Sequence, residues 1–219
     1  MSYAVKEIYY TLQGEGVHSG RPAVFLRFTG CNLWSGREKD RARARGGCGR
    51  WCDTDFVGTN GPGGGRFANA EALADAVLAA WPDDSERPAA QAARYVVCTG
   101  GEPLLQLDEA LIDALHERSF QVGVETNGTL PAPPGIDYLC VSPKGGAPLK
   151  LTSGDELKLI YPQPELPPER FAGLSFSRRS LQPLDGPERV ENIAATLAYC
   201  LAHPEWQLSL QTHKVLQIP

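Results

Sequence analysis

The sequence predicts an α/β fold, a truncated and open (β/α) partial barrel of the TIM type with about six strands and three helices. Short apolar runs alternate with helical stretches in the first half, a pattern typical of parallel sheets. The expected strands outnumber the expected helices, so the sheet is incompletely covered, which argues against a full eight-fold barrel. Polar motifs follow directly after several strands, where barrel-like α/β proteins build their sites.

The strands are short stretches rich in β-branched, aromatic and aliphatic residues. The clearest is 23–29 (AVFLRFT), a nearly continuous apolar run that contains one charge, Arg27. A buried arginine is costly unless it is paired, so we expect Arg27 to point at a ligand or a carboxylate. The alternative is a strand-end arginine that reaches solvent. The expected strands are 5–12, 23–29, 95–98, 121–125, 137–141, 156–161, 174–177 and 208–211.

Three helices are expected from apolar residues at helical spacing. The first begins at an Asn69 cap and runs to Trp81, the second covers about 108–118, and the third follows Gly186-Pro187 and runs to about Ala202. A turn-rich spacer precedes the first helix, and a polar, alanine-rich linker (82–94) follows it. The residues expected to face inward are Leu73, Val77, Ala80 and Trp81; Leu111, Ile112 and Leu115; and Val190, Ile193, Ala194, Leu197 and Leu201.

Length and composition favour a cytoplasmic protein of one domain. A chain of 219 residues can bury enough surface to fold without disulfides. The net charge of −5 gives no basic face for nucleic acid. The N-terminal MSYAVKEIYY lacks the pattern of a signal peptide, and no apolar run approaches the roughly 18 residues of a membrane helix.

Three of the six cysteines lie in a polar, Gly- and Arg-rich loop, where packing is a poor reason for them. Cys31, Cys48 and Cys52 therefore indicate a soft-metal or iron–sulfur site with one metal position left open. A zinc site remains an alternative, although no fourth ligand is close in sequence and no C-x2-C pair occurs. Cys98, Cys140 and Cys200 stand in apolar contexts and are expected to be buried thiols.

A second signal is Thr99-Gly100-Gly101-Glu102-Pro103 after the strand 95–98. Two glycines let a backbone edge approach a ligand closely, and a glutamate can accept from an ammonium or hydroxyl group. By itself the stretch could be an ordinary strand-to-helix turn. Because five such motifs follow strands, we expect them to share one pocket: TGGEP, ETNG, SPK, LQPLD and QTHK.

The cysteine loop and the GGEP stretch together resemble the radical S-adenosylmethionine (SAM) superfamily, and the whole chain is similar to its 7-carboxy-7-deazaguanine synthase family. Two intervals depart from the common C-x3-C-x2-C: sixteen residues separate Cys31 from Cys48 and three separate Cys48 from Cys52. The motifs that carry the resemblance are LQGEG, FLRFTGCNLWSGRE, CDTDF, TGGEPLLQ, ETNGT, SPK, LQPLDG and QTHKVLQIP.

The resemblance implies a lyase that converts 6-carboxy-5,6,7,8-tetrahydropterin to 7-carboxy-7-deazaguanine with loss of ammonia, in the queuosine and deazapurine pathway. It implies one radical-SAM domain over 1–219 with an enlarged cluster-binding loop at 31–52. It also implies a [4Fe–4S] cluster, SAM, Mg²⁺, a flavodoxin- or ferredoxin-type reductant and a homodimer. The rival interpretations are a glycyl-radical activase, which LQGEG and the QTHKVLQIP end disfavour, and a non-catalytic zinc or iron–sulfur protein, which leaves TGGEP, SPK and LQPLD without a purpose.

The resemblance assigns roles by position. The cysteines Cys31, Cys48 and Cys52 would hold the cluster, and Thr54, rather than the alternative Asp53, would bind Mg²⁺. Residues expected at SAM are Trp51, Gly100, Gly101, Glu102, Ser142, Pro143, Lys144, Gln182, Pro183, Leu184 and Asp185, with Glu125 a less certain member. Residues expected at the substrate are Leu12, Gln13, Gly14, Glu15, Arg27, Thr99, His213 and Pro219, the last through a backbone carboxylate on a strand-like VLQI segment.

Overall fold

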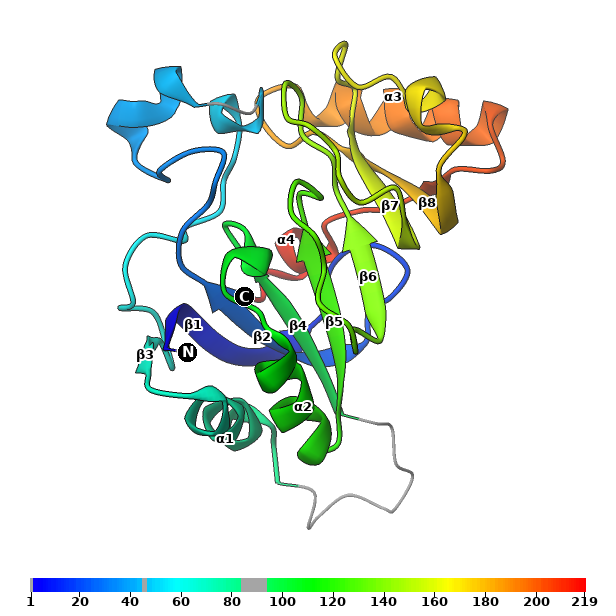
Figure 1. Cartoon of the computed structure of the whole chain (residues 1–219). Coiled ribbons are helices and arrows are strands. Elements are labelled where there is room, and N and C mark those ends of the chain that lie inside the picture. Colours follow the sequence, from blue (N-terminus) through cyan, green and yellow to red (C-terminus); the bar gives the residue numbers. More distant parts are fainter. Residues whose placement is uncertain (1, 45–46, 84–93) are drawn as a thin grey trace.

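The computed structural model describes residues 2–44, 47–83 and 94–219, which build one nine-stranded sheet (Figure 1). The strand order is β3-β1-β2-β4-β5-β6-β7-β8-β9. Neighbours from β2 to β9 pair in parallel, whereas β1 is antiparallel to β2 and β3. The bounds are β1 Tyr3–Leu12, β2 Pro22–Phe28, β3 Gly65–Phe67, β4 Arg94–Gly100, β5 Phe120–Thr126, β6 Tyr138–Val141, β7 Ser153–Tyr161, β8 Ser175–Pro183 and β9 Gln207–Leu208.

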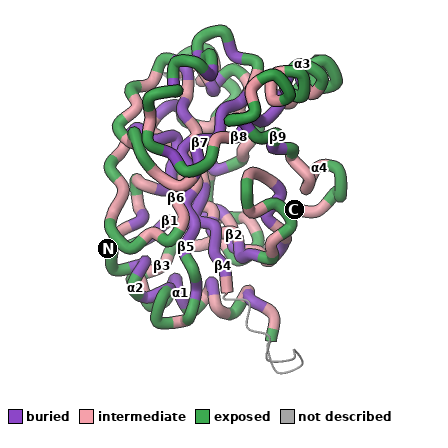
Figure 2. The backbone as a smooth tube through the Cα atoms, turned by 90° about the vertical axis from the view of Figure 1, so that its right-hand side faces the viewer, coloured by how far each residue is buried: buried purple, intermediate pink, exposed green. Residues whose placement is uncertain are grey.

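The expected open partial barrel is therefore confirmed, with more strands than predicted. The central parallel strands are buried along most of their length (Figure 2), as expected for strands covered on both faces. The described residues also form four short 3-10 helices: η1 Glu38–Arg43 and η2 Gly47–Arg50 before β3, η4 Pro103–Leu105 after β4, and η5 Pro168–Phe171 before β8. Among the described residues, no helix is long and apolar enough to cross a membrane.

Helices α1 (Ala70–Ala80) and α2 (Glu109–Glu117) pack side by side against the first part of the sheet (Figure 1). The expected Asn69 cap is present, since its side chain accepts from the amide of Ala72. Asp108 caps α2 in the same way through Leu111. Their expected apolar faces enter the core with strands β1, β2, β4 and β5.

The prediction for α3 (Arg189–Ala202) was wrong about its inward face. Val190 and Leu201 are 76% and 78% exposed, whereas the fully buried residues of the helix are Asn192 and Thr196. Asn192 faces β8 because its side-chain amide donates to the carbonyl of Leu184, just after that strand. The helix thus turns a mixed face toward the sheet, in which Tyr199 and Cys200 pack against the core beside Asn192 and Thr196, and leaves Val190, Leu197 and Leu201 outside.

Four other predictions need correction. β8 runs on to Pro183, so that Leu181 to Pro183 belong to the strand rather than to a loop after it. The turn-rich spacer contains β3, and the expected strand VLQI is replaced by a short helix, α4 (Thr212–Leu216). Cys98 and Cys140 are buried as expected, but Cys200 is only partly buried. Most of the 82–94 linker lies outside the described residues.

Candidate active site

A cavity of about 490 Å³ opens at the carboxyl edge of the parallel strands. Residues from all five motifs that follow strands line it, which confirms that these motifs share one pocket. Most of the expected site residues line this wall: Cys31, Cys48, Trp51, Cys52 and Thr54; Leu12, Gln13, Gly14, Glu15 and Arg27; Thr99, Gly100, Gly101, Ser142 and Lys144; Gln182, Pro183, Leu184, Asp185, His213 and Pro219. Glu102 and Pro143 are not part of the lining.

The three loop cysteines occupy one part of this wall. Burial raises the pKa of Cys31, and it raises the pKa of Cys48 to about 11, against the nearby Lys144 ammonium, which lowers it. No group of three His, Cys, Asp or Glu side chains in the described ranges converges closely enough to hold a single metal ion. In an iron–sulfur cluster each thiolate binds through its sulfur at the corner of a larger inorganic core.

The loop around the cysteines is braced by Arg41. Its guanidinium donates to the carbonyl of Gly49 at 2.7 Å and lies 4.7 Å from the ring centre of Trp34. Trp34 meets the ring of Phe56 edge-on, with centroids 5.8 Å apart. These contacts fix the approach of the loop to the cavity although the loop has little regular structure.

Gly101 of the TGG stretch is required by the start of the cysteine loop, which lies against it. A Cβ atom on Gly101 would lie 2.2 Å from the carbonyl oxygen of Gly30 and 2.8 Å from the Cβ of Cys31. The amide of Glu102 donates to that same carbonyl at 2.9 Å. The segment after β4 thus holds the start of the cysteine loop, and the backbone of Gly100 and Gly101 lines the cavity.

Glu102 is fully buried and has a structural set of partners. Its carboxylate accepts from the hydroxyl of Thr126 at 2.7 Å, from the amide of Asn127 at 2.8 Å and from the amide of Leu104 at 3.0 Å, at the start of η4 (Pro103–Leu105). Burial raises its pKa, and these hydrogen bonds oppose that effect. Asn127 in turn donates to Asn32, so Glu102 ties the ETNG turn to the cysteine loop.

A polar cluster closes the opposite side of the cavity. Lys158 on β7 donates to Glu15 at 2.6 Å and to Glu125 at 3.3 Å. Gln13 also donates to Glu125, at 3.0 Å. Burial acts to raise the pKa of Glu15, but the Lys158 ammonium lowers that pKa to about 2. Glu15 is therefore an ionised acceptor in the wall.

Arg27 is paired, as expected, and lines the cavity. Its guanidinium donates to the carboxylate of Glu7 at 2.8 Å and to the hydroxyl of Tyr9 at 3.3 Å. Both partners lie on β1, the antiparallel neighbour of β2. The interpretation of Arg27 as a strand-end residue reaching solvent is thereby excluded.

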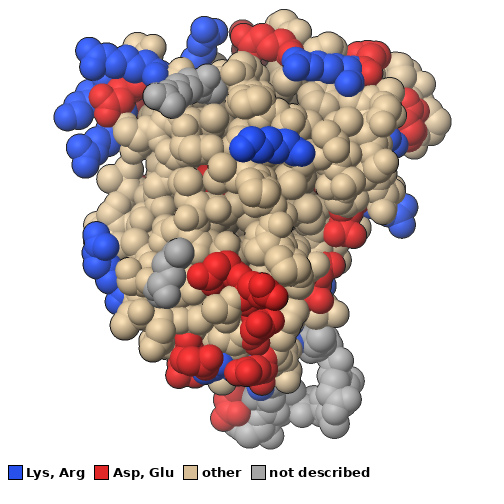
Figure 3. Space-filling view, viewed as in Figure 1, with Lys and Arg blue, Asp and Glu red and all other residues tan. Residues whose placement is uncertain are grey.

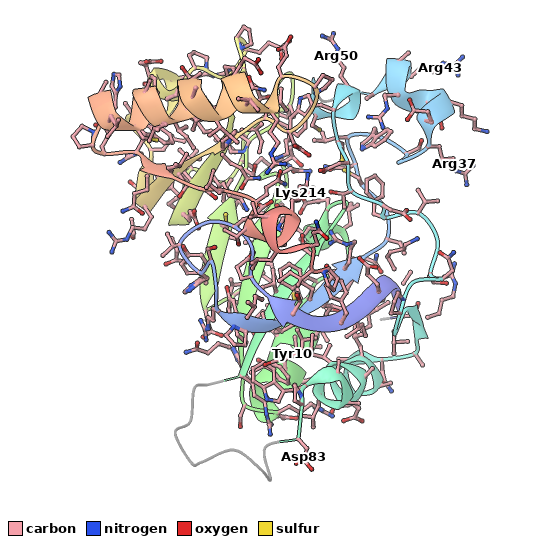
Figure 4. The ribbon with its side chains drawn as sticks, turned by 180° about the vertical axis from the view of Figure 1, so that it is seen from behind. Tyr10, Arg37, Arg43, Arg50, Asp83 and Lys214 are labelled. Carbon is pink, nitrogen blue, oxygen red and sulfur yellow. The ribbon has the colours of Figure 1, made fainter. Side chains whose placement is uncertain are left out.

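Helix α4 brings His213 and Lys214 to the cavity (Figure 4). A Cβ atom on Gly14 would fall 2.2 Å from the imidazole of His213, so this glycine permits the close approach of the ring. Lys214 forms ion pairs with Asp53 and Asp185. The oxygen of Pro219 accepts from the hydroxyl of Thr11 at 3.0 Å.

Thr54 lies in sequence between two aspartates whose carboxylates each form an ion pair with a lysine. Asp53 pairs with Lys214 at 2.6 Å and Asp55 pairs with Lys6 at 2.7 Å. The Thr54 hydroxyl lines the cavity and makes no hydrogen bond with any residue that the structure describes. Each aspartate is thus balanced by a lysine, whereas the Thr54 oxygen has no partner among the described residues.

Several residues of the wall were not expected from the sequence, among them Lys158, Glu7 and Tyr9. Lys158 had a usable signal, since it is a charge inside the apolar run ELKLIY, and the argument applied to Arg27 applies to it equally. Glu7 and Tyr9 carry no such signal in a single sequence.

Relatives of this chain extend over its full length, although no family model matches it. A curated relative from Bradyrhizobium diazoefficiens, named 7-carboxy-7-deazaguanine synthase, is 62% identical over 218 residues and covers 100% of both chains. Relatives of the same name from Caulobacter vibrioides and Bordetella pertussis are each 60% identical, with 100% of both chains covered. The fold is similar to the crystal structure of QueE from Escherichia coli, with a TM-score of 0.68 and 26% identity over 96% of this chain and 94% of that one.

Proposed function

The chain belongs to the 7-carboxy-7-deazaguanine synthase family, and we propose that it is a radical SAM lyase that converts 6-carboxy-5,6,7,8-tetrahydropterin to 7-carboxy-7-deazaguanine with loss of ammonia. The observation that carries the proposal is one cavity lined by three cysteines, a glycine edge and a set of polar groups suited to a heterocycle. Full-length likeness to enzymes of this name disfavours both an activase and a non-catalytic metal protein.

Cys31, Cys48 and Cys52 would hold a [4Fe–4S] cluster, since three thiols at one part of the wall are the donor set for three of its irons. When bound, the cluster and SAM supply the radical chemistry. For SAM we propose Trp51, Gly100, Gly101, Ser142, Lys144 and the stretch Gln182 to Asp185. Lys144 supports this, because its ammonium is held by the Ser142 hydroxyl at 2.6 Å beside Cys48. Glu102 and Pro143 would act through these neighbours.

The substrate would lie between the β1 end and α4. Glu15 and Gln13 suit the amine and amide edge of a pterin, and Arg27 suits its carboxylate. Thr99, His213, Pro219, Leu12 and Gly14 complete the proposed contacts. The chain's contribution is to orient the pterin ring and to exclude water from it.

For Mg²⁺ we propose Thr54, whose hydroxyl lines the cavity without a described partner and is flanked by two aspartates that are each paired with a lysine. Mg²⁺ prefers oxygen ligands and keeps several waters, so a single protein ligand together with the substrate carboxylate is sufficient.

A small acidic redox protein of the flavodoxin or ferredoxin type is the proposed reductant. Residues 37–50 carry six basic and two acidic side chains in a chain whose net charge is −5. Arg37, Lys39, Arg43 and Arg50 are exposed on this loop, and basic side chains gather over it in Figure 3. Such a patch steers an acidic partner toward the adjacent cysteines. The six free cysteines suit the reducing cytoplasm, where such donors occur.

A homodimer through α3 is also proposed. The exposed residues Val190, Leu197 and Leu201 recur at helical spacing and form one apolar stripe. A stripe of this kind is typical of a helix that packs against a partner. A second copy is the partner that closed symmetry favours.

Anaerobic turnover tests the main proposal. Reconstituted protein, SAM, Mg²⁺ and dithionite are incubated with 6-carboxy-5,6,7,8-tetrahydropterin, and the product is followed by ultraviolet absorbance and mass spectrometry. We expect 7-carboxy-7-deazaguanine and one ammonia for each pterin consumed. Cleavage of SAM with no deazaguanine formed would overturn the assignment of this substrate.

A further inference from the structure

Lys158 is a buried cation in the cavity wall that the proposed assignments leave without a role. It lies in the middle of β7, and its side chain is 5% exposed. Its ammonium lies 2.6 Å from a carboxylate oxygen of Glu15 and 3.3 Å from one of Glu125. Fixing a lysine between two carboxylates requires that all three side chains be aligned by their strands and loops.

The carboxylates of Glu15 and Glu125 differ in how many further hydrogen bonds each can accept. One oxygen of Glu15 accepts from Gln182 at 3.0 Å and from Gln211 at 2.9 Å, and the other accepts from Lys158. Glu125 uses only Oε1, which accepts from Gln13 and Lys158. Its Oε2 accepts no hydrogen bond from any described residue, and Glu125 lines the cavity.

Within the described ranges, neither glutamate has an ion pair other than Lys158. Two facing carboxylates in a poorly solvated wall cannot both stay ionised without a cation, because like charges at close range favour protonation of one of them. A protonated carboxyl presents an O–H donor in place of an acceptor. The amine and amide hydrogens of a pterin would then meet a donor.

We propose that Lys158 is a positioning residue that balances the charges of Glu15 and Glu125 and aligns both side chains, so that both offer acceptor oxygens to the donor edge of the bound heterocycle. This inference rests on the proposed function, because it presupposes the pterin substrate. It adds Lys158 and the open oxygen of Glu125 to the groups that determine how the ring is recognised.

Other titratable groups surround Lys158 and are accounted for. Glu156, on the same strand, accepts from Ser180 at 2.5 Å and from Tyr138 at 2.9 Å, on the side away from the main cavity. Cys140 on β6 is fully buried and its pKa is raised well above its usual range by burial. His213 on α4 lies on the Glu15 side, and Lys144 after β6 adds a second positive charge. Neither forms an ion pair with Glu15 or Glu125 within the described ranges.

The test compares Lys158→Met, Lys158→Arg and the charge-balanced pair Lys158→Met with Glu125→Gln. The control is Arg118→Met, because Arg118 is also paired with two carboxylates, Glu71 at 2.8 Å and Asp75 at 2.6 Å, and none of these three residues lines the cavity. For each variant we would measure kcat and KM for 6-carboxy-5,6,7,8-tetrahydropterin across pH, the thermal midpoint, and dithionite-driven SAM cleavage without pterin.

Lys158→Met should raise KM at least about tenfold at neutral pH. Without the ammonium, one of the two carboxylates is misaligned or, once protonated, presents a donor in place of an acceptor. The pH profile of kcat/KM should gain a protonation step, while SAM cleavage without pterin stays at the wild-type level. Lys158→Arg should keep the wild-type profile, and adding Glu125→Gln to Lys158→Met should recover part of the affinity. Arg118→Met should change the thermal midpoint alone.

A wild-type KM and pH profile in Lys158→Met would overturn the inference, as would the same KM change in Arg118→Met. If Lys158→Met does not fold, the double variant is compared with Glu125→Gln: similar KM values support the ion-pair role, and a much larger KM in the double variant contradicts it. Wild-type protein that cleaves SAM but leaves the pterin unconverted would overturn the proposed function itself, which no result on the variants can do.

Discussion

The ammonium of Lys214 lies 2.6 Å from a carboxylate oxygen of Asp53, immediately after the last cysteine of the loop. The same ammonium lies 2.6 Å from Asp185, which follows β8. The Lys214 side chain on α4 therefore links the segment that follows Cys52 to the segment that follows β8. The Lys214 hydrogen bond lowers the pKa of Asp185, so the pair is fully charged at neutral pH and is lost only as the pH falls through that lowered pKa.

Lys214→Met should loosen this connection and raise KM for SAM by about two- to tenfold, because partly exposed ion pairs contribute modestly. The cluster should remain. Initial rates at varied SAM measure the effect, and Lys150→Met, an exposed lysine away from the cavity, is the control. Equal KM values in both variants would show that the bridge has no part in the site.

Replacing Cys48 by alanine should abolish an intact four-iron cluster and all SAM cleavage, because one of three thiolate ligands is lost. Iron and sulfide content and the absorbance of anaerobically reconstituted protein measure this. Cys200→Ala, which removes a thiol far from the loop in sequence and outside the cavity lining, should keep the wild-type iron content. A full cluster in Cys48→Ala would remove that cysteine from the ligand set.

Thr54→Val keeps the shape of the side chain and removes its oxygen. We expect the stimulation of turnover by Mg²⁺ to weaken while the cluster and SAM cleavage stay intact. A Mg²⁺ titration of the rate provides the measurement, with Thr152→Val, an exposed position, as the control. An unchanged titration would move the ligand elsewhere, with Asp53 as the next candidate.

Charge reversal on the cysteine loop separates docking from chemistry. The triple change Arg37→Glu, Arg43→Glu and Arg50→Glu should lower turnover driven by a reduced acidic flavodoxin by about tenfold or more at low salt. Turnover driven by dithionite should not change, since that small reductant needs no docking. Arg66→Glu with Arg178→Glu, exposed on β3 and β8, is the control. Equal loss with both reductants would contradict the docking role.

Two charges on α3 test the dimer. Leu197→Lys with Leu201→Lys should convert a dimer to a monomer in size-exclusion chromatography with light scattering, because buried charges at an apolar interface are costly. Leu105→Lys, another exposed leucine, should leave the dimer intact. A wild-type protein that runs as a monomer, or a double variant that stays dimeric, would contradict this interface.

The sequence predicted well what depends on local pattern. Parallel strands that end in polar motifs must bring those motifs to one edge, and they do so for Thr99, Ser142 and Gln182. The helix cap at Asn69 depends on a single side chain and was equally clear.

Predictions that depend on tertiary contacts were less successful. Periodicity located α3, but which stripe faces the sheet depends on the Asn192 contact with the Leu184 carbonyl, formed across the fold. Glu102 was expected at a ligand because it follows two glycines, whereas its hydrogen-bond partners come from the turn after the next strand along the chain. The pattern of a single sequence does not show which distant residues will contact one another in the fold. The assignment of residues 1–219 to a single domain stays a prediction.

The burial of Glu102 links assembly of the site to folding of the chain. Its carboxylate is cut off from water and receives hydrogen bonds from Thr126 and Asn127, about one β–α unit further along. A half-folded chain that buried Glu102 before β5 arrived would carry the cost of a poorly partnered carboxylate, several kcal/mol. The β4 segment that carries Glu102 and the β5 segment that carries Thr126 and Asn127 should therefore fold in one cooperative event. Native-state hydrogen exchange should find the amides of both segments opening together rather than in sequence.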